Sequence, residues 1–477
     1  MVMSTICAPA TPSGGAIAII RISGPEAITI VSGIFSKDIR NATGYTVHYG
    51  HIKMPDYNNI DEQLPVNLHS RTECDIIDDV LISVFKAPHS YTGEDSIEIS
   101  CHGSSYIIQK ILEALIHRGA RMANPGEFTK RAFLAGKMDL SQAEAVADLI
   151  AASNKAAHHM AMSQMRGGVS NELNGLRQQL LHITSLIELE LDFSDHEDIE
   201  FADRQQLSEQ LESLHNHIQR LVKSFHTGNA LKTGIPVAII GAPNVGKSTL
   251  LNLLVHEERA IVSDIQGTTR DLIEDTIQID GLPFRFIDTA GLRATTDRIE
   301  LMGIERSLQA AQKADIIILL TEPNKDFPDI EPRFASNNHH RQIVLKVVNK
   351  SDLVIPDSSF LYHSQQSNNH IHISSLTGAG MPSLQKALIS AADTLLSDAK
   401  EIGRDTTIIT NLRHYEALHH ILDAVSRTKQ ALANGISSDL IAEDLRQCLH
   451  YLADITGEEI TSDEILSNIF SNFCIGK

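Results

Sequence analysis

The segment Gly241–Ser248, with the sequence GAPNVGKS, constrains this chain more than any other. It matches the phosphate-binding pattern G-x-x-x-x-G-K-[ST] at every defined position. The apolar run of residues 235–240 before it predicts a strand buried on both faces, and residues 249–254 after it predict a helix. The segment is therefore expected at a helix N-terminus, where unpaired backbone N–H groups and the helix dipole favour a polyphosphate.

Each defined residue of this loop has a physical role toward a nucleotide. Gly241 and Gly246 let the backbone approach the phosphates closely. Lys247 is the candidate catalytic cation, because its ammonium would neutralise the β/γ-phosphate oxygens, and the Ser248 hydroxyl is a candidate ligand of Mg²⁺. For the pattern taken alone, a chance glycine-rich turn is the alternative.

Further elements of a guanine-nucleotide site follow in chain order. Thr269, in the GTTRD segment of residues 267–271, is expected to complete the Mg²⁺ shell. A predicted hairpin, residues 272–287 with a turn-favouring DG dipeptide, leads into the segment DTAG. There Asp288 would hold Mg²⁺ through water, and the Gly291 N–H would meet the γ-phosphate.

The base is predicted to be guanine from the segment Asn349–Asp352 (NKSD), which follows the apolar run 343–348. The Asp352 carboxylate would accept hydrogen bonds from guanine N1–H and the exocyclic amine, whereas adenine presents an acceptor at N1. Leaving this polar group unpaired against adenine costs about 1–3 kcal/mol, which is ample discrimination. Backbone N–H groups of Ser374–Leu376 (SSL) are expected at guanine O6.

Two residues distinguish this domain from a Ras-like switch. Leu292, after DTAG, cannot orient an attacking water as a glutamine does, so fast hydrolysis would need another residue. Asn244 either ligates a monovalent cation beside the β/γ-phosphates or is an ordinary turn residue, and the residues alone leave both open. The full set expected to bind the nucleotide is Asn244, Val245, Gly246, Lys247, Ser248, Thr249, Ser263, Asp264, Ile265, Gln266, Gly267, Thr268, Thr269, Asp288, Thr289, Ala290, Gly291, Asn349, Lys350, Ser351, Asp352, Ser374, Ser375 and Leu376.

Composition is that of a globular protein with more than one domain. The 477 residues are too many for one core, and roughly two to four domains are expected. A net charge of −20 argues against a general nucleic-acid coat, so any RNA contact should be local. Scattered cysteines without metal-ligand spacing fit free thiols in a reducing cytoplasm. No secretory signal and no bilayer-spanning run is found, so a cytoplasmic location away from membranes is expected.

Residues 1–120 are expected to form an α+β domain. Period-2 alternation puts Arg21 on the strand face shared with Ile17 and Ile19, and places Glu98 on the face opposite Ile97. The predicted strands and helix of this domain are residues 16–22, 79–85, 96–100 and 107–116.

Helical patterns lie on both sides of the nucleotide-binding segment. Leucine and isoleucine recur at spacings of three and four in residues 121–230 and again in residues 391–477. Residues 231–390 are the expected nucleotide domain, entered through a linker between Gly228 and Gly234. The fold class expected is multidomain, α/β and α, with this domain inserted into one discontinuous helical domain.

Segments outside the nucleotide domain carry a specific resemblance. With the nucleotide motifs, they are similar to the MnmE (TrmE) family of tRNA modification GTPases over essentially the whole length. One departure is Ser104, where the family usually has glycine; Ser104 would be strained if that position needs a positive φ. The matching segments are RISG at 21–24, TGED at 92–95, PGEF at 125–128, KMDLSQAEA at 137–145 and CIGK at 474–477.

The resemblance implies an architecture and an activity. The architecture is an N-terminal tetrahydrofolate-binding α+β domain and a discontinuous helical domain, with a Ras-like P-loop GTPase domain inserted. The activity is addition of a (carboxymethyl)aminomethyl-type group to C5 of the wobble uridine of certain tRNAs, using a one-carbon unit from 5-formyltetrahydrofolate or another tetrahydrofolate. The family acts as a cytoplasmic homodimer that forms a heterotetramer with MnmG, an FAD- and NADH-dependent protein. Its GTP hydrolysis requires K⁺ and dimerisation of the GTPase domains.

The resemblance also implies residue roles by position. Asn244 becomes a K⁺ ligand rather than a turn residue, and Glu300 becomes the catalytic group that orients water. Without the resemblance, Glu300 would be read as an exposed helix carboxylate. The remaining assignments are K⁺ to Ser263, Ile265 and Thr268, Mg²⁺ to Ser248 and Thr269, and folate to Arg21, Glu98, Lys137 and Lys477.

A regulatory or ribosome-assembly GTPase is the rival hypothesis, because such proteins share the nucleotide motifs. The segments that resemble the folate domain argue against it, and folate binding would discriminate. A folate-binding module with a degenerate GTPase domain is disfavoured, because no nucleotide-binding element is missing.

Overall fold

A computed structural model describes residues 4–12, 14–54, 76–192, 204–257, 275–287, 309–327, 342–353, 370–396, 407–434, 436, 438–458, 470, 473 and 476. The chain divides into two compact units, each treated by itself below. One comprises residues 1–147 with 453–477, and the other comprises residues 148–452. The domain boundaries expected at residues 120, 230 and 390 stay predictions.

The first unit is built on a mixed sheet with strand order β3-β4-β5-β2-β1-β6. All neighbouring pairs are antiparallel except β1 and β6. The three strands predicted from the sequence are confirmed as β2, β4 and β5. The strands are β1 Ile6–Pro9, β2 Ile17–Ser23, β3 Thr46–Lys53, β4 Ile76–Phe85, β5 Ser96–His102 and β6 Arg121–Met122.

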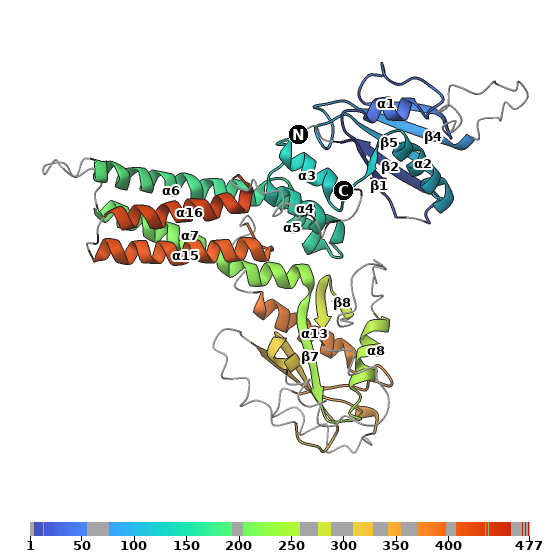
Figure 1. Cartoon of the computed structure of the whole chain (residues 1–477). Coiled ribbons are helices and arrows are strands. Elements are labelled where there is room, and N and C mark those ends of the chain that lie inside the picture. The colour runs from blue at the N-terminus through green and yellow to red at the C-terminus, as the bar shows by residue number, and fades with distance from the viewer. Residues whose placement is uncertain are drawn as a thin grey trace, which may run out of the picture. The chain divides into compact units, whose positions relative to one another are not determined.

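One face of this sheet is covered by helices α1 (Ala27–Ser32) and α2 (Ser105–His117) (Figure 1). Side chains that point to this face, such as those of Ile20, Ile82 and Ile99, are fully buried. The other face carries Arg21 and Glu98, as the alternation predicts. Ser104 has a φ of −70° as the residue before α2, so the glycine-to-serine departure causes no strain.

The end of the chain returns to the first unit. Phe470 packs with Leu140 and Ala143 of α4 (Leu140–Ala151). Gly126 directly precedes α3 (Glu127–Leu134), and the Phe470 carbonyl oxygen packs against it. A Cβ at residue 126 would lie only 2.7 Å from that oxygen, so glycine allows the contact.

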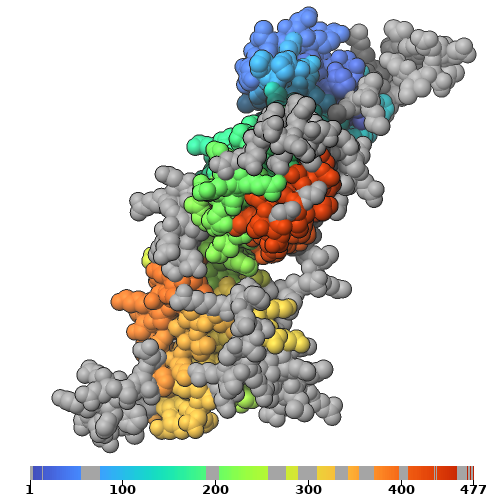
Figure 2. Space-filling model, turned by 90° about the vertical axis from the view of Figure 1, so that its left-hand side faces the viewer, coloured from blue at the N-terminus to red at the C-terminus, as the bar shows by residue number. Residues whose placement is uncertain are grey.

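The second unit contains long helices that run alongside one another (Figure 1). Ion pairs link helices that are distant in sequence. Lys429 of α15 (Leu412–Ala433) contacts Glu212 of α7 (Arg204–Thr233), and Arg446 of α16 (Ser438–Thr456) lies 3.1 Å from Glu188 of α6 (Gly168–Asp192). In the space-filling view, the C-terminal helices (red) pack against the helices that precede the second sheet (green) (Figure 2). No helix among the described residues is long and apolar enough to cross a membrane. The helices are α5 Lys155–Met165, α6 Gly168–Asp192, α7 Arg204–Thr233, α15 Leu412–Ala433 and α16 Ser438–Thr456.

The second sheet has the order β12-β11-β10-β7-β9-β8, and every pair is parallel except the β8–β9 hairpin. Asp280 and Gly281 both have positive φ, of 51° and 79°, which confirms the predicted tight turn. Its elements are β7 Ile235–Gly241, α8 Lys247–Glu257, β8 Asp275–Ile279, β9 Leu282–Phe286, β10 Ile316–Thr321, β11 Ile343–Val348, the 3₁₀ turn η1 Ser351–Leu353, β12 Ile371–His372 and α13 Met381–Leu395.

Both faces of the second sheet are buried. Helices α8 and α13 cover one face, where Leu250 and Leu384 pack on alternate strand residues. A second cluster, with Ala311 and Ile317, covers the other face. This explains why β7 and β10 have continuous apolar sequences rather than alternating ones.

The linker predicted between Gly228 and Gly234 is wrong, because α7 continues to Thr233 and only Gly234 separates it from β7. Gly228 has a packing role instead. A Cβ there would lie 2.5 Å from the carbonyl oxygen of Ile409, in the segment that leads into α15. Beside it, the Ile409 N–H donates a 3.1 Å hydrogen bond to the Ser224 hydroxyl. This contact joins the chain before and after the second sheet.

Replacing Gly228 by alanine should therefore destabilise the second unit. The added methyl group forces α7 and the segment before α15 apart, and such overpacking costs about 1–3 kcal/mol. Urea unfolding followed by circular dichroism measures the change. Gly175→Ala in α6 is the matched control, because nothing lies within 4 Å of its Cβ position. There alanine should be neutral or stabilising by up to about 1 kcal/mol, and equal effects of the two variants would contradict the packing role.

Candidate functional site

The segment Gly241–Ser248 lies where β7 ends and α8 begins, as predicted. It follows the carboxyl end of a central parallel strand, between β10 and β9, where ligands bind in open α/β sheets. A Cβ on Gly241 would lie 2.5 Å from the carbonyl oxygen of Leu320. Glycine at this position therefore lets the loop leave the sheet directly against β10.

The loop side chains are arranged around an exposed surface. The Lys247 ammonium donates to the carbonyl oxygens of Gly241 and Ala242, both at 2.9 Å, and burial lowers its pKa. Asn244 is exposed and has a φ of 62°, a left-handed conformation that asparagine tolerates. Ser248 and Thr249 are exposed in the first turn of α8.

Asn349 connects the loop to the segments predicted to bind the base. Its side chain is 1% exposed, and its amide donates to the Val245 carbonyl at 2.8 Å. Its amide oxygen accepts from the N–H and the hydroxyl of Ser375, both at 2.9 Å. A Cβ on Gly246, which has a φ of 99°, would lie 2.3 Å from the Asn349 amide nitrogen. The loops after β7, β11 and β12 are thereby held at fixed spacing.

Asp352, the predicted guanine-binding carboxylate, is held by Ser374. The Ser374 hydroxyl donates to it at 2.5 Å. The backbone N–H of Ser374 donates to the Ala379 carbonyl, and that of Ser375 to Asn349. Of the segment expected to bind guanine O6, Leu376 is 81% exposed.

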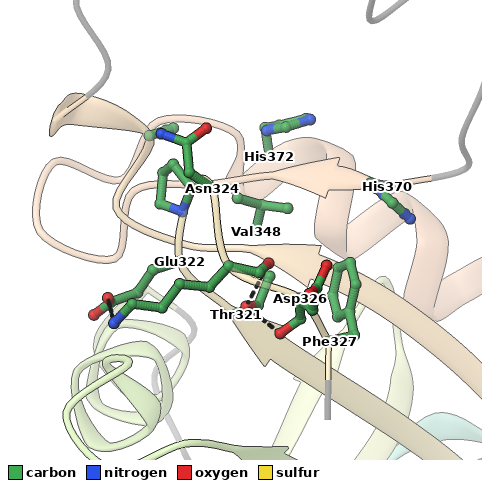
Figure 3. A pocket seen from close by; sticks show the side chains of 11 residues that line it. Thr321, Glu322, Asn324, Asp326, Phe327, Val348, His370 and His372 are labelled. Atoms are coloured by element: carbon green, nitrogen blue, oxygen red, sulfur yellow. Dashed lines mark hydrogen bonds and ion pairs between the residues drawn. The ribbon is translucent and has the colours of Figure 1, made fainter. Parts of the chain in front are cut away.

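A cavity of about 310 Å³ lies beside these segments (Figure 3). Its walls are the loop after β10, with Glu322 and Phe327, and the ends of β11 and β12, with Ser351 and His372. Ser351 belongs to the NKSD motif, so the cavity and the predicted base site share a wall.

Several predicted site residues lie outside the described residues: Ser263, Asp264, Ile265, Gln266, Gly267, Thr268, Thr269, Asp288, Thr289, Ala290, Gly291, Glu300 and Lys477. Their roles stay predictions. Within the described ranges, no group of three or more His, Cys, Asp or Glu side chains could hold a metal. This does not bear on the predicted K⁺ and Mg²⁺ sites, which consist mainly of hydroxyl, amide and main-chain oxygens.

In the first unit, Arg21 and Glu98 face each other across β2 and β5. The guanidinium Nε and Nη2 donate to one Glu98 oxygen at 3.0 and 2.7 Å, and Nη1 lies 3.3 Å from the Gly476 carbonyl oxygen. The guanidinium also lies over the rings of Tyr91 and Phe128, at 5.5 and 5.7 Å from their centroids. Nothing local in the sequence marks Tyr91 and Phe128 as partners of Arg21.

The other predicted folate residues lie near the ends of this cluster. Lys137 is exposed and lies beside Gly93 of the TGED segment. Its Cε is 3.4 Å from the point that a Cβ at residue 93 would occupy. Gly476 has a φ of 92°, and its Cβ position is 2.1 Å from the Pro9 carbonyl oxygen. The chain thus passes against β1 one residue before Lys477.

An ion network surrounds the buried guanidinium of Arg131, and no local sequence pattern marks it. Arg131 of α3 is 4% exposed and lies 2.9 Å from Glu94 and 3.0 Å from Glu127. Arg121 pairs with the same Glu127 at 2.5 Å. Glu94 also accepts from the hydroxyl of Ser23, the last residue of β2, at 3.0 Å. The TGED and PGEF segments therefore hold α3, with Phe128, against β2, with Arg21.

Burial of Glu127 by itself would raise the pKa of its carboxyl. Hydrogen bonds from Arg121 and the Asn124 N–H, followed by Arg131, outweigh burial and lower the pKa from 4.5 to about 2. Because the folded-state pKa lies below the unfolded-state value, ionised Glu127 stabilises the fold above about pH 4.5. This contribution is lost as the pH falls toward 2.

Glu127→Gln should therefore lower the free energy of unfolding by on the order of 3 kcal/mol at neutral pH. The difference from the wild type should shrink as the pH falls below about 4.5. Urea unfolding at a series of pH values measures it. The exposed carboxylate of Glu26 provides the control, since Glu26→Gln should leave the unfolding free energy nearly unchanged. A difference for Glu127→Gln that stays constant with pH would contradict the assigned ion pairing.

Comparisons with known proteins match both units. Residues 5–137 match the family model described as GTP-binding protein TrmE N-terminus, and residues 140–474 match the MnmE helical domain. The chain is 49% identical over 499 residues to the tRNA modification GTPase MnmE of Phocaeicola vulgatus, with 99% of each chain covered. It is also 49% identical over 486 residues to the protein of that name from Parabacteroides distasonis, with 100% of each covered.

Among solved structures, the chain is similar to the G domain of the T. maritima FeoB iron transporter. The identity is 21% and the TM-score 0.23, over 33% of this chain and 98% of that one. Relatives that align with nearly the whole chain, together with the two matched domains, establish the family. The chain belongs to the MnmE (TrmE) family, and its two relatives described above are named tRNA modification GTPases.

Proposed function

We propose that this protein hydrolyses GTP as part of tRNA modification. The observation that carries the proposal is the side chain of Asn349, which ties the phosphate-binding loop to the segments that would bind guanine. The two ends of one nucleotide would thereby be held at fixed spacing. The names of the full-length relatives support tRNA modification as the setting.

The nucleotide would be held by groups of known chemistry. Lys247 would turn from its own loop carbonyls to the β/γ-phosphates, and Ser248 with Thr269 would ligate Mg²⁺, a hard cation that prefers oxygen. Asp352 would select guanine, and its hydrogen bond from Ser374 supports this by fixing the carboxylate. Glu300 would orient the attacking water in place of Leu292.

We further propose that hydrolysis depends on K⁺. Asn244 would contribute its amide oxygen, together with oxygens of Ser263, Ile265 and Thr268. The exposed, left-handed position of Asn244 in the loop supports this, because an exposed amide in the phosphate-binding loop is accessible to a cation. A cation there supplies positive charge where negative charge develops during phosphoryl transfer.

GTP turnover in KCl and NaCl at equal ionic strength tests the cation site. The wild type should turn over quickly only in KCl, and Asn244→Ala should lose roughly tenfold to a hundredfold of this rate. Asp280→Ala in the β8–β9 turn is the matched control, because Asp280 is also exposed with a positive φ, of 51°, and lies outside the predicted nucleotide site. Equal wild-type rates in both salts would contradict the K⁺ assignment and favour a regulatory GTPase.

The folate assignment involves Arg21, Glu98, Lys137 and Lys477. Arg21 and Glu98 are partly exposed, at 16% and 26%, on the sheet face that α1 and α2 leave open. A carboxylate suits the donor–acceptor edge of a pterin, and cations suit its glutamate tail. The described residues fit such a ligand, which would supply the one-carbon unit when bound.

Calorimetric titration with 5-formyltetrahydrofolate tests this assignment. Arg21→Ala should weaken binding about tenfold or more, because a charged hydrogen-bonding group is lost. Arg40→Ala removes an exposed guanidinium, paired with Asp38, in the same unit and should leave binding unchanged. If the wild type itself does not bind the folate, the assignment fails.

The remaining proposals concern partners. Large apolar side chains are exposed on edge strand β3 and its neighbour β4, on the same face as Arg21 and Glu98. Such a patch marks an interaction surface, which supports a homodimer formed through this sheet. By family resemblance, the dimer would work in the cytoplasm with MnmG on the wobble uridine of tRNA, at C5. The exposed side chains are Val47 at 61% and Tyr49 at 61% on β3 and Leu81 at 47% on β4, and Tyr45 at 71% directly precedes β3.

A further inference from the structure

The backbone of the NKSD motif is strained at Lys350. This residue has a φ of 58°, a left-handed conformation that costs a non-glycine residue on the order of 1 kcal/mol or more. Its ammonium forms an ion pair with Glu322, which directly follows β10. Asn349, the preceding residue, is anchored to the phosphate-binding loop, and Asp352 lies two residues further along. The position of the Lys350 side chain therefore affects the conformation of the segment predicted to bind the base, Asn349–Asp352.

Glu322 is itself held in a closed turn. The Thr321 hydroxyl lies 3.2 Å from the carbonyl oxygens of both Lys325 and Asp326, and the Lys325 N–H donates to the Glu322 carbonyl at 3.2 Å (Figure 3). The Glu322 carboxylate accepts from the Lys325 ammonium at 2.6 Å. One carboxylate thus lies between an ammonium of its own turn and the ammonium of the NKSD motif.

The charges around Glu322 keep it ionised. Hydrogen bonds from Lys325 and then Lys350 lower the pKa of its carboxyl to about 2. The Glu322 side chain is 20% exposed and that of Lys350 is 34% exposed, so the pair is more shielded than a typical surface pair. The same turn forms a wall of the 310 Å³ cavity, which Ser351 of the motif also lines.

We propose that Glu322 is a positioning residue for the guanine-nucleotide site: it draws the Lys350 ammonium toward the turn after β10. This rests on the proposed GTP binding. Without Glu322, Lys350 would be a cation without a partner only two residues from Asp352, whose carboxylate must stay available to the base. Pairing between Lys350 and Asp352 would then compete with guanine, and the strained backbone at Lys350 would lose its support.

The test is release of a fluorescent GDP analogue from the full-length protein, measured by stopped flow, with GTP turnover measured in parallel. Glu322→Gln should speed release roughly threefold to tenfold and raise KM for GTP similarly, as loss of a partly shielded ion pair predicts. Turnover at saturating GTP should stay at the wild-type rate, because Glu322 would touch neither phosphate nor water. Glu322→Asp should restore part of the affinity.

Two further variants separate positioning from a general structural role. Lys325→Met removes only the other partner of Glu322 and should speed release less than Glu322→Gln does, because the pair of Glu322 with Lys350 stays intact. In a Lys350→Met background, Glu322→Gln should have no further effect, because the pair it breaks is already gone. Urea unfolding verifies that each variant is folded.

Unchanged release in Glu322→Gln, or additive effects of Glu322→Gln and Lys350→Met, would overturn the proposal. A fall in turnover at saturating GTP with unchanged KM would also overturn it. If the wild-type protein failed to bind the GDP analogue at all, the proposed GTP binding would fail first, which distinguishes the two failures.

Discussion

The absence of a side chain at Gly246 allows the amide of Asn349 to lie against the phosphate-binding loop, and the second unit's site depends on this approach. Any Cβ there would lie 2.3 Å from the amide nitrogen. Through that amide, the loop after β7 is bonded to the loops after β11 and β12. A site whose phosphate and base ends are already spaced pays less ordering entropy when a nucleotide binds.

The first unit uses similar chemistry for a different purpose. Arg131 lies buried between Glu94 and Glu127, so its charge is fully paired and its role is to hold α3. Arg21 and Glu98 form a pair that stays partly exposed on an open sheet face. The Arg131 ion pairs would support a ligand site at Arg21 and Glu98. Supporting groups of this kind fix the orientation of the side chains that contact a ligand.

The second sheet joins the helices without a flexible linker. Helix α7 reaches Thr233, and β7 begins at Ile235. Near this junction Lys232 lies 2.7 Å from Asp148, and the Gln278 amide of the β8–β9 hairpin donates to the Ser153 carbonyl at 2.5 Å. The hairpin therefore contacts the helical part of the unit directly, through a hydrogen bond as well as through the continuous chain.

The sequence by itself determined the local elements and the identity of the nucleotide motifs. Strand β11, the Asp280-Gly281 turn and the faces of Arg21 and Glu98 all follow from short-range periodicity and backbone preference, which neighbouring residues decide. Strand β10 was missed, although it lies in the centre of the second sheet. Only the tertiary structure decided the contacts that cross large sequence distances, such as Arg21 with Gly476 and Gly228 with Ile409. The pairing of Glu322 with Lys350 belongs to the same class, because it depends on which strands become neighbours, and no local pattern records that.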